Sequence, residues 1–137
     1  MMVKKYEFLK HTGDLKFRAY SSSVKGMFEN CALAISSVLS RGKKIKSLIK
    51  KEISVSGNDY ESLLYSFIDE LIYLFDAEGF IVSKAELEIE DGKLKGIVYG
   101  DDSTNYKDLD AIKAPTYAEM YVKNKGKKWE CQVVLDV

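Results

Sequence analysis

Two segments of this 137-residue chain space their apolar residues as a helix does, every three or four positions, so these residues fall on one face. The first set is Val24, Met27, Phe28, Cys31, Ile35, Val38 and Leu39, and the second is Leu63, Leu64, Phe67, Ile68, Leu71, Ile72 and Phe75. Serines at residues 21–23 offer an N-cap to the first segment, and Asn58 with Glu61 has the spacing of a capping box before the second. Gly42 and Gly79 follow the two segments as expected C-terminal stops. The pattern predicts two amphipathic helices, each with one buried face.

Much of the remaining sequence alternates apolar and polar residues, which is typical of half-buried strands. Asp91-Gly92 lies between two such stretches and favours a tight hairpin turn. The expected strands cover residues 4–11, 15–20, 48–56, 80–90, 94–99, 112–122 and 129–137. This order of elements predicts an α+β domain in which the two helices pack on a largely antiparallel or mixed β-sheet.

The sequence contains no marker of a domain boundary. Pro115 is the only proline, and there is no proline- or serine-rich linker, long charge block or low-complexity tract. A length of 137 residues suits one sizeable core better than two. We therefore expect residues 1–137 to form a single domain.

The charged residues exclude one class of partner-binding protein. Lysine and arginine number 21 in total and balance 21 acidic residues, so the formal net charge is zero. A protein that holds nucleic acid by its overall charge is normally basic, although a local patch can still bind it. Arg18 and Arg41 are the only arginines. Because arginine is the usual bidentate reader of phosphate and guanine, dense base-specific readout is not expected.

The sequence also indicates a cellular location. No apolar run approaches the roughly 20 residues of a membrane-spanning helix, and the first residues lack the apolar stretch of a secretory signal. Cys31 and Cys131 each lie in an apolar stretch, which favours buried free thiols in a reducing compartment. We therefore expect a cytoplasmic protein with no membrane partner.

Two acidic groups come together at the end of the chain. The last expected strand runs to Val137, so the Asp136 carboxylate lies next to the α-carboxylate. Neighbouring anions repel, and a divalent cation is one remedy. Asp14 begins another expected strand and would add an oxygen donor if the two strands were neighbours. Oxygen donors favour Ca²⁺ or Mg²⁺ over Zn²⁺ or Cu²⁺, and the alternative is a frayed, hydrated terminus.

His11 is the only histidine, and it stands three residues before Asp14. Two interpretations are open: a hydrogen-bonded structural residue that holds the first turn, or a base, ligand or residue that orients a ligand. The sequence shows no nucleophile to pair with it. It also lacks the phosphate-binding loop, the dinucleotide-binding motif and the H-E-x-x-H motif.

Acidic residues also gather on and after the second helical segment. Asp69 and Asp76 share one helix face with Tyr73, and Glu78 follows. Negative charge near a helix C-terminus is disfavoured by roughly 0.3–1 kcal/mol. An acidic docking surface for a basic partner is one hypothesis, and a solvated face is the other.

A lysine run precedes the third expected strand. Its members are Lys43, Lys44, Lys46, Lys50 and Lys51. Such a run can contact RNA phosphates. Ordinary solvation is the competing interpretation, because no exposed aromatic platform is interleaved with the run.

Several segments, taken in order, resemble the archease family. Residues 6–20, YEFLKHTGDLKFRAY, are similar to its opening, where an H-T-A-D turn leads into a strand. Residues 28–34, 63–80, 112–117 and 133–137 resemble its first helix, its second helix and its last two strands. The resemblance covers essentially the whole chain. The chain departs from the pattern at Gly13, which replaces an alanine, and at Ala118-Glu119, where the family commonly has a histidine-containing pair.

The resemblance implies an accessory protein and not an enzyme. Archeases assist the GTP-dependent tRNA-splicing RNA ligase, which joins a 3′-phosphate or 2′,3′-cyclic phosphate end to a 5′-hydroxyl end. The chain would then activate this ligase in tRNA processing, by promoting its guanylylation and multiple turnover. It would act in a chaperone-like manner and reach tRNA indirectly, through the ligase.

The resemblance also implies a metal site formed by Asp14, Asp136 and Val137. Ca²⁺ is the expected ion, with Mg²⁺ or Mn²⁺ as alternatives. His11 would orient the ligand residues without contacting the ion itself. The residues expected to face the partner are Asp69, Asp76 and Glu78. Two other functions stay open: a metal-dependent phosphohydrolase that uses Asp14 and Asp136, and an RNA-binding chaperone that uses the lysine run.

Overall fold

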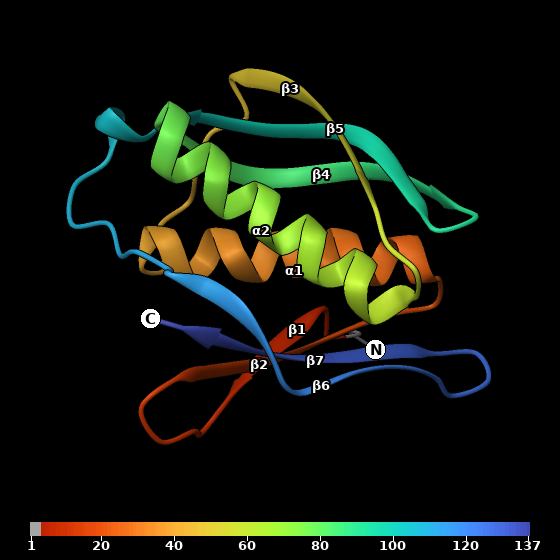
Figure 1. Cartoon of the computed structure of the whole chain (residues 1–137). Helices are drawn as coiled ribbons and strands as arrows, with labels where there is room; N and C mark the ends of the chain where they lie inside the picture. The colour runs from red at the N-terminus through yellow and green to blue at the C-terminus, as the bar shows by residue number, and fades with distance from the viewer. Residues whose placement is uncertain (1–3) are drawn as a thin grey trace.

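Two helices lie between two β-sheets in the computed structural model of the chain, which describes residues 4–137 (Figure 1). Helix α1 spans Val24–Ser40, helix α2 spans Tyr60–Glu78, and one turn of 3-10 helix spans Ser103–Asn105. The strands are β1 Tyr6–Leu9, β2 Leu15–Ser21, β3 Ile49–Ser56, β4 Phe80–Glu90, β5 Lys93–Asp102, β6 Ala114–Asn124 and β7 Trp129–Asp136. The predicted α+β class with two helices is confirmed.

The strands divide between two sheets, whereas the sequence pattern led us to expect one. The larger sheet has the order β1-β2-β7-β6 and the smaller one has the order β3-β5-β4. Every strand pair described in residues 4–137 is antiparallel. The division is set by pairings between distant segments, such as β2 with β7, that alternation within one strand does not encode.

The helices begin and end close to the expected positions. The Ser23 hydroxyl caps α1, as expected. The N-cap of α2 is Asp59, one residue after the expected Asn58, because Asp59 and Ser62 complete a reciprocal capping box. Gly79 ends α2 with a φ of 62°, a conformation that costs glycine little. No helix within residues 4–137 is long and apolar enough to cross a membrane.

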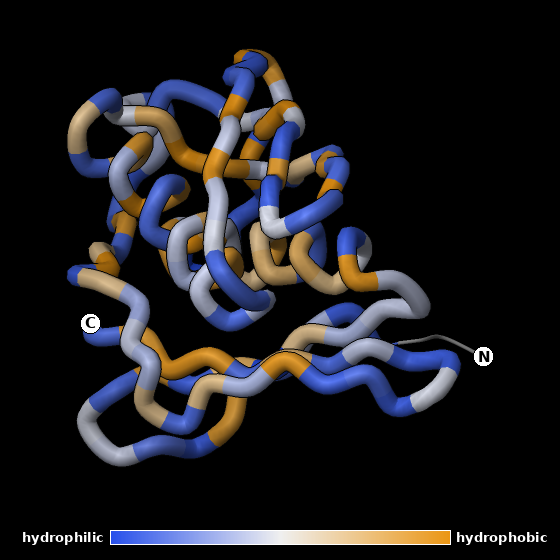
Figure 2. Tube along the Cα trace, turned by 45° about the vertical axis from the view of Figure 1, so that its right-hand side comes forward, coloured by the Kyte–Doolittle hydropathy of each residue, from blue (hydrophilic) through white to orange (hydrophobic). Residues whose placement is uncertain are grey.

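The core fills the space on both sides of α1. This helix packs against β2 of the larger sheet and β4 of the smaller one. Phe28 of α1 and Phe67 of α2 are fully buried, with their ring centroids 6.0 Å apart. Cys31 and Cys131 are buried free thiols, as expected. Figure 2 shows apolar residues distributed along the strands and helices, while the hairpin tips of the larger sheet are mainly hydrophilic.

Strand β7 connects the two ends of the molecule. One end, on the left in Figure 1, carries the end of β7 and the β1–β2 turn, and the end of α2 lies on the same side of the molecule but near the smaller sheet. The opposite end carries the hairpin between β6 and β7. At about 3.3 Å per residue, the length of β7 separates these ends by roughly 25 Å.

Candidate functional site

The pairing of β2 with β7 brings two of the predicted metal ligands to neighbouring strands. In its register Leu15 lies opposite Leu135, and one further step leads to Asp14 and Asp136. Asp14 is exposed at the end of the β1–β2 turn, and Asp136 is half-buried as the last residue of β7. Opposite positions on antiparallel strands carry their side chains on the same face. The register thus brings the Asp14 and Asp136 positions, from distant parts of the sequence, to the same end of the two central strands of the larger sheet.

The end of β7 is held on both sides. Asp136 pairs with Ala114 of β6, and its carbonyl accepts a hydrogen bond from the backbone N–H of Lys113 at 2.8 Å. Strand β2 flanks β7 on the other side. This ordered edge contrasts with the frayed terminus that was the alternative interpretation.

The donor set at this edge consists of oxygen atoms. Within residues 4–137, no three side chains of His, Cys, Asp or Glu come together in a way that could hold a metal ion. Asp14 and Asp136 supply two carboxylates, so a further protein donor would be of another type, such as a main-chain oxygen of Val137. Hard cations such as Ca²⁺ and Mg²⁺ accept such donors and complete their coordination with water. The chemistry of these residues therefore fits the expected ion.

His11 is tied to a carboxylate on β6. Its Nε2 donates a hydrogen bond to Oε2 of Glu119 at 2.7 Å, and Lys16 donates to Oε1 at 3.2 Å. The hydrogen bonds from His11 and Lys16, together with the Lys16 charge, lower the pKa of Glu119. His11 Nδ1 is buried without a hydrogen-bond partner among the described residues. This geometry favours the structural interpretation of His11, as the residue that fixes the turn leading to Asp14.

Glu119 is a partner that sequence reasoning missed. The pairing of β6 with β7 is interrupted between Thr116 and Tyr121, so the intervening residues form an irregular bulge. Glu119 has a φ of 56°, and its carbonyl accepts a hydrogen bond from Nε2 of Gln132 at 2.7 Å. Bulges re-aim side chains, which is why Glu119 reaches the β1–β2 turn. The only signal in the sequence was the unusual pair formed by Ala118 and Glu119.

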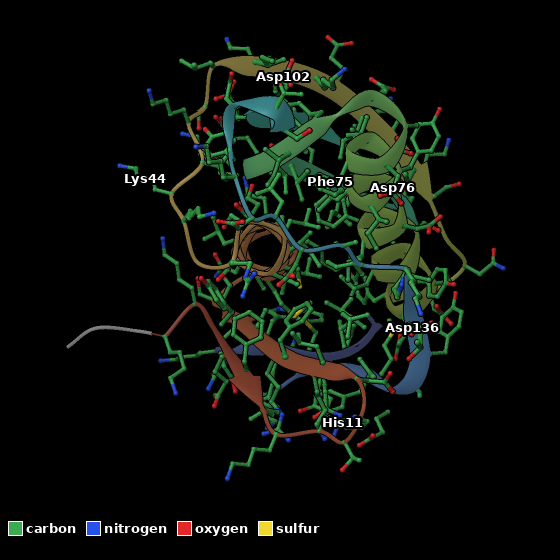
Figure 3. All side chains as sticks on the ribbon, turned by 90° about the vertical axis from the view of Figure 1, so that its left-hand side faces the viewer. His11, Lys44, Phe75, Asp76, Asp102 and Asp136 are labelled. Atoms are coloured by element: carbon green, nitrogen blue, oxygen red, sulfur yellow. The ribbon has the colours of Figure 1, made fainter. Side chains whose placement is uncertain are left out.

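Helix α2 presents all three predicted partner-facing carboxylates to solvent. Asp69 and Asp76 are exposed, and Tyr73 on the same face is 54% exposed. Figure 3 shows Asp76 in the helical layer and Asp136 in the sheet below it. Glu78 differs, because its carboxylate accepts a hydrogen bond from Lys51 of β3 at 2.5 Å. Asp69 and Asp76 make no side-chain hydrogen bond or ion pair within residues 4–137 and are therefore the freer pair.

The lysine run after α1 is partly engaged within the protein. Lys43, Lys50 and Lys51 contact a carbonyl, an aromatic ring and a carboxylate respectively. Lys44 and Lys46 are exposed in the segment between α1 and β3. The run therefore offers fewer free cations than its sequence suggests.

Residues 6–137 match the family described as the Archease protein family (MTH1598/TM1083). The chain belongs to the archease family. Protein archease of Pyrococcus furiosus is 36% identical over 142 residues, covering 98% of this chain and 100% of that relative. Protein archease of Sulfurisphaera tokodaii is 32% identical over 139 residues, with coverage of 98% and 100%. The resemblance inferred from the sequence is confirmed.

Solved structures share the archease fold of this chain. The solution structure of protein 1598 from Methanobacterium thermoautotrophicum has a TM-score of 0.83 and 28% identity, covering 98% of this chain and 100% of that one. A crystal structure of a Thermotoga maritima archease, described as a possible chaperone, has a TM-score of 0.65 and covers 100% and 98%. At 18% identity, the second likeness shows the fold alone.

Proposed function

We propose that this archease is a non-enzymatic activator of the GTP-dependent tRNA-splicing RNA ligase. In this role it promotes guanylylation of the ligase and multiple turnover in the joining of 3′-phosphate or 2′,3′-cyclic phosphate ends to 5′-hydroxyl ends. The observation that supports the proposal is the register of β2 with β7, which ends at Leu15 opposite Leu135 and leaves Asp14 and Asp136 as the next residues of the two segments. The description of the Thermotoga maritima relative as a possible chaperone fits an accessory role.

The proposed metal site comprises Asp14, Asp136 and a main-chain oxygen of Val137. The expected ion is Ca²⁺, with Mg²⁺ or Mn²⁺ as alternatives, and when bound it would supply concentrated positive charge to attract anionic oxygens. The two strands fix the spacing of the aspartates. His11 is a positioning residue, since its bond to Glu119 anchors the turn that carries Asp14.

The exposed face of α2 is the proposed contact with the ligase. Asp69 and Asp76 favour a basic partner surface, and charge pairs at the rim of an interface mainly raise the association rate in a salt-sensitive way. Glu78 contributes less in this proposal, because Lys51 already balances its charge. To activate, the archease must bind the productive state of the ligase more tightly than the unproductive one.

We place this activity in the cytoplasm, with tRNA as the molecule that the ligase joins. The two buried free thiols support a reducing compartment.

The test compares ligase guanylylation and multiple turnover in the presence of wild-type archease, Asp14→Asn and Asp136→Asn. We expect each variant to lose stimulation by about tenfold or more, since even the residues that support metal ligands usually cost about tenfold or more when substituted. Glu52→Gln is the matched control, because this carboxylate is exposed on β3 of the other sheet. Equal stimulation by all proteins would refute the role of the site. Hydrolysis of nucleotides or RNA ends by pure archease would favour the phosphohydrolase instead.

A further inference from the structure

The hairpin between β6 and β7 carries the densest positive charge on the larger sheet. Residues 123–128 read Lys-Asn-Lys-Gly-Lys-Lys, contain no acidic residue and are all exposed. The backbone N–H of Lys125 donates to the carbonyl of Lys128 at 2.7 Å, and Gly126 allows the turn with a φ of 76°. Figure 2 shows this tip as strongly hydrophilic. The four lysines are therefore presented by a defined turn.

Two tyrosines under the hairpin position two of its lysines. Nζ of Lys128 lies 4.2 Å from the ring centroid of Tyr20, and Nζ of Lys123 lies 4.3 Å from that of Tyr121. An ammonium group is attracted to the face of an aromatic ring at such distances. These contacts hold the lysine side chains against the protein and reduce the conformational freedom that a ligand would otherwise have to remove.

The nearby acidic groups are hydrogen-bonded within the protein, although Glu7 is also partly exposed. Glu130 is only 6% exposed, and it accepts hydrogen bonds from the Tyr121 hydroxyl at 2.6 Å and from Lys125 at 3.1 Å. Glu7 accepts the hydroxyl of Tyr20 at 2.5 Å. The negative charge of Glu130 is therefore buried and partly balanced by Lys125, while the lysines of the hairpin are exposed residues at the surface.

A further lysine extends the positive surface along β1. The carbonyl of Lys5 accepts the backbone N–H of Tyr20 at 2.9 Å, which places exposed Lys5 beside the ring that Lys128 covers. We define the hairpin surface as Lys5, Lys123, Lys125, Lys127 and Lys128. It lies at the end of β7 opposite Asp136, roughly 25 Å away at about 3.3 Å per residue.

We propose that the hairpin surface binds the phosphate backbone of RNA directly. Lysine is a point charge that suits phosphates without reading bases. The tyrosine rings offer no stacking platform, because Tyr20 is 6% exposed and both rings are covered by lysines. The contact is accordingly independent of sequence and sensitive to salt. The choice of RNA over an acidic protein rests on the proposed function, in which tRNA is the molecule joined beside the archease.

The test measures binding of fluorescently labelled tRNA to the full-length protein, without ligase, across a series of salt concentrations. Lys127→Gln combined with Lys128→Gln is compared with Lys44→Gln combined with Lys46→Gln, which removes the same charge from the exposed loop after α1. We expect the hairpin variant to bind about tenfold more weakly at low salt, with a salt slope shallower by about one to two. The loop variant should bind as the wild type does. Thermal unfolding verifies that both variants are folded.

Three results would overturn the proposal: no salt-dependent tRNA binding by the wild type, equal loss in both variants, or no loss in the hairpin variant. Binding of an unstructured acidic polypeptide as tightly as tRNA would assign the surface to an acidic protein instead. Ligase guanylylation in the absence of RNA separates this proposal from the activator role. The hairpin variant should stimulate that step normally, whereas Asp14→Asn should fail to stimulate it and still bind tRNA.

Discussion

Nε2 of His11 lies 2.7 Å from Oε2 of Glu119, so the β1–β2 turn is hydrogen-bonded to the bulge of β6 across the face of the larger sheet. Lys16 binds the other oxygen of the same carboxylate. One glutamate in a left-handed backbone conformation therefore fixes the position of the segment that precedes Asp14.

This contact predicts a pH-dependent contribution to stability. The bonds from His11 and Lys16 lower the pKa of Glu119 below its ordinary value of 4.5. A lowered carboxyl pKa stabilises the fold above the unfolded value, and the effect is lost as the pH falls through the folded value. The gap in melting temperature between the wild type and Glu119→Gln should shrink as the pH falls from about 7 to about 3. A gap that stays constant over this range, as for the control Glu52→Gln, would contradict the prediction.

The proposed cation site predicts opposite effects of one substitution with and without metal. Without a cation, Asp14→Asn should raise the melting temperature slightly, because it removes repulsion from Asp136. With excess Ca²⁺, the wild type should gain stability, by about 2.7 kcal/mol at one hundred times Kd, and the variant should gain much less. Thermal unfolding with chelator and with Ca²⁺ measures both effects. An identical response of the two proteins to Ca²⁺ would exclude Asp14 as a ligand.

The two thiols predict a protein that is inert to thiol reagents until it unfolds. Cys31 and Cys131 are both 0% exposed, with their sulfur atoms 3.3 Å apart. Burial raises the pKa of the Cys31 thiol well above its ordinary value, so the reactive thiolate is scarce. A chromogenic disulfide reagent should react slowly with the native protein and quickly with both thiols in denaturant. Rapid reaction of the native protein would show that α1 separates readily from β7.

The aromatic contact between α1 and α2 predicts a large loss of stability when one of its side chains is truncated. Phe67 is fully buried and packs against Phe28. Phe67→Ala should lower the free energy of unfolding by about 3–5 kcal/mol, through lost burial and the cavity left behind. Urea denaturation measures the change, and Tyr73→Ala on the exposed face of α2 is the control. A loss below about 1 kcal/mol for Phe67→Ala would mean that the helices repack around the gap.

The elements of the fold were predictable where the signal is local. Helical spacing located both helices, and Asp91-Gly92 located the hairpin that joins β4 and β5. The N-cap of α2 was misplaced by one residue, because Asn58 and Asp59 are both good caps and only the contact with Ser62 decides between them. The division into two sheets was not predictable from alternation, since register and partner choice depend on distant strands.

The candidate site was predictable only in part. Asp14 and Asp136 could be linked because Asp14 precedes one expected strand and Asp136 lies near the end of another, and the structure makes those strands neighbours. The ion pair of Glu78 with Lys51 and the bond from His11 to Glu119 could not be foreseen. Both contacts join residues far apart in the chain. The bond from His11 to Glu119 also depends on the bulge in β6, which no glycine, proline or other turn residue in the sequence indicates.

Helix α1 lies between the two sheets, and no hydrogen-bonded ladder joins those sheets within residues 4–137. The two sheets are therefore held together mainly by the apolar faces of α1 and α2 that pack against them. If either sheet unfolded, one apolar face of α1 would be exposed to water. The packing of α1 against the other sheet would then lose its support. The halves of the molecule should consequently melt in one step, with the amide protons of α1 among the last to exchange with solvent.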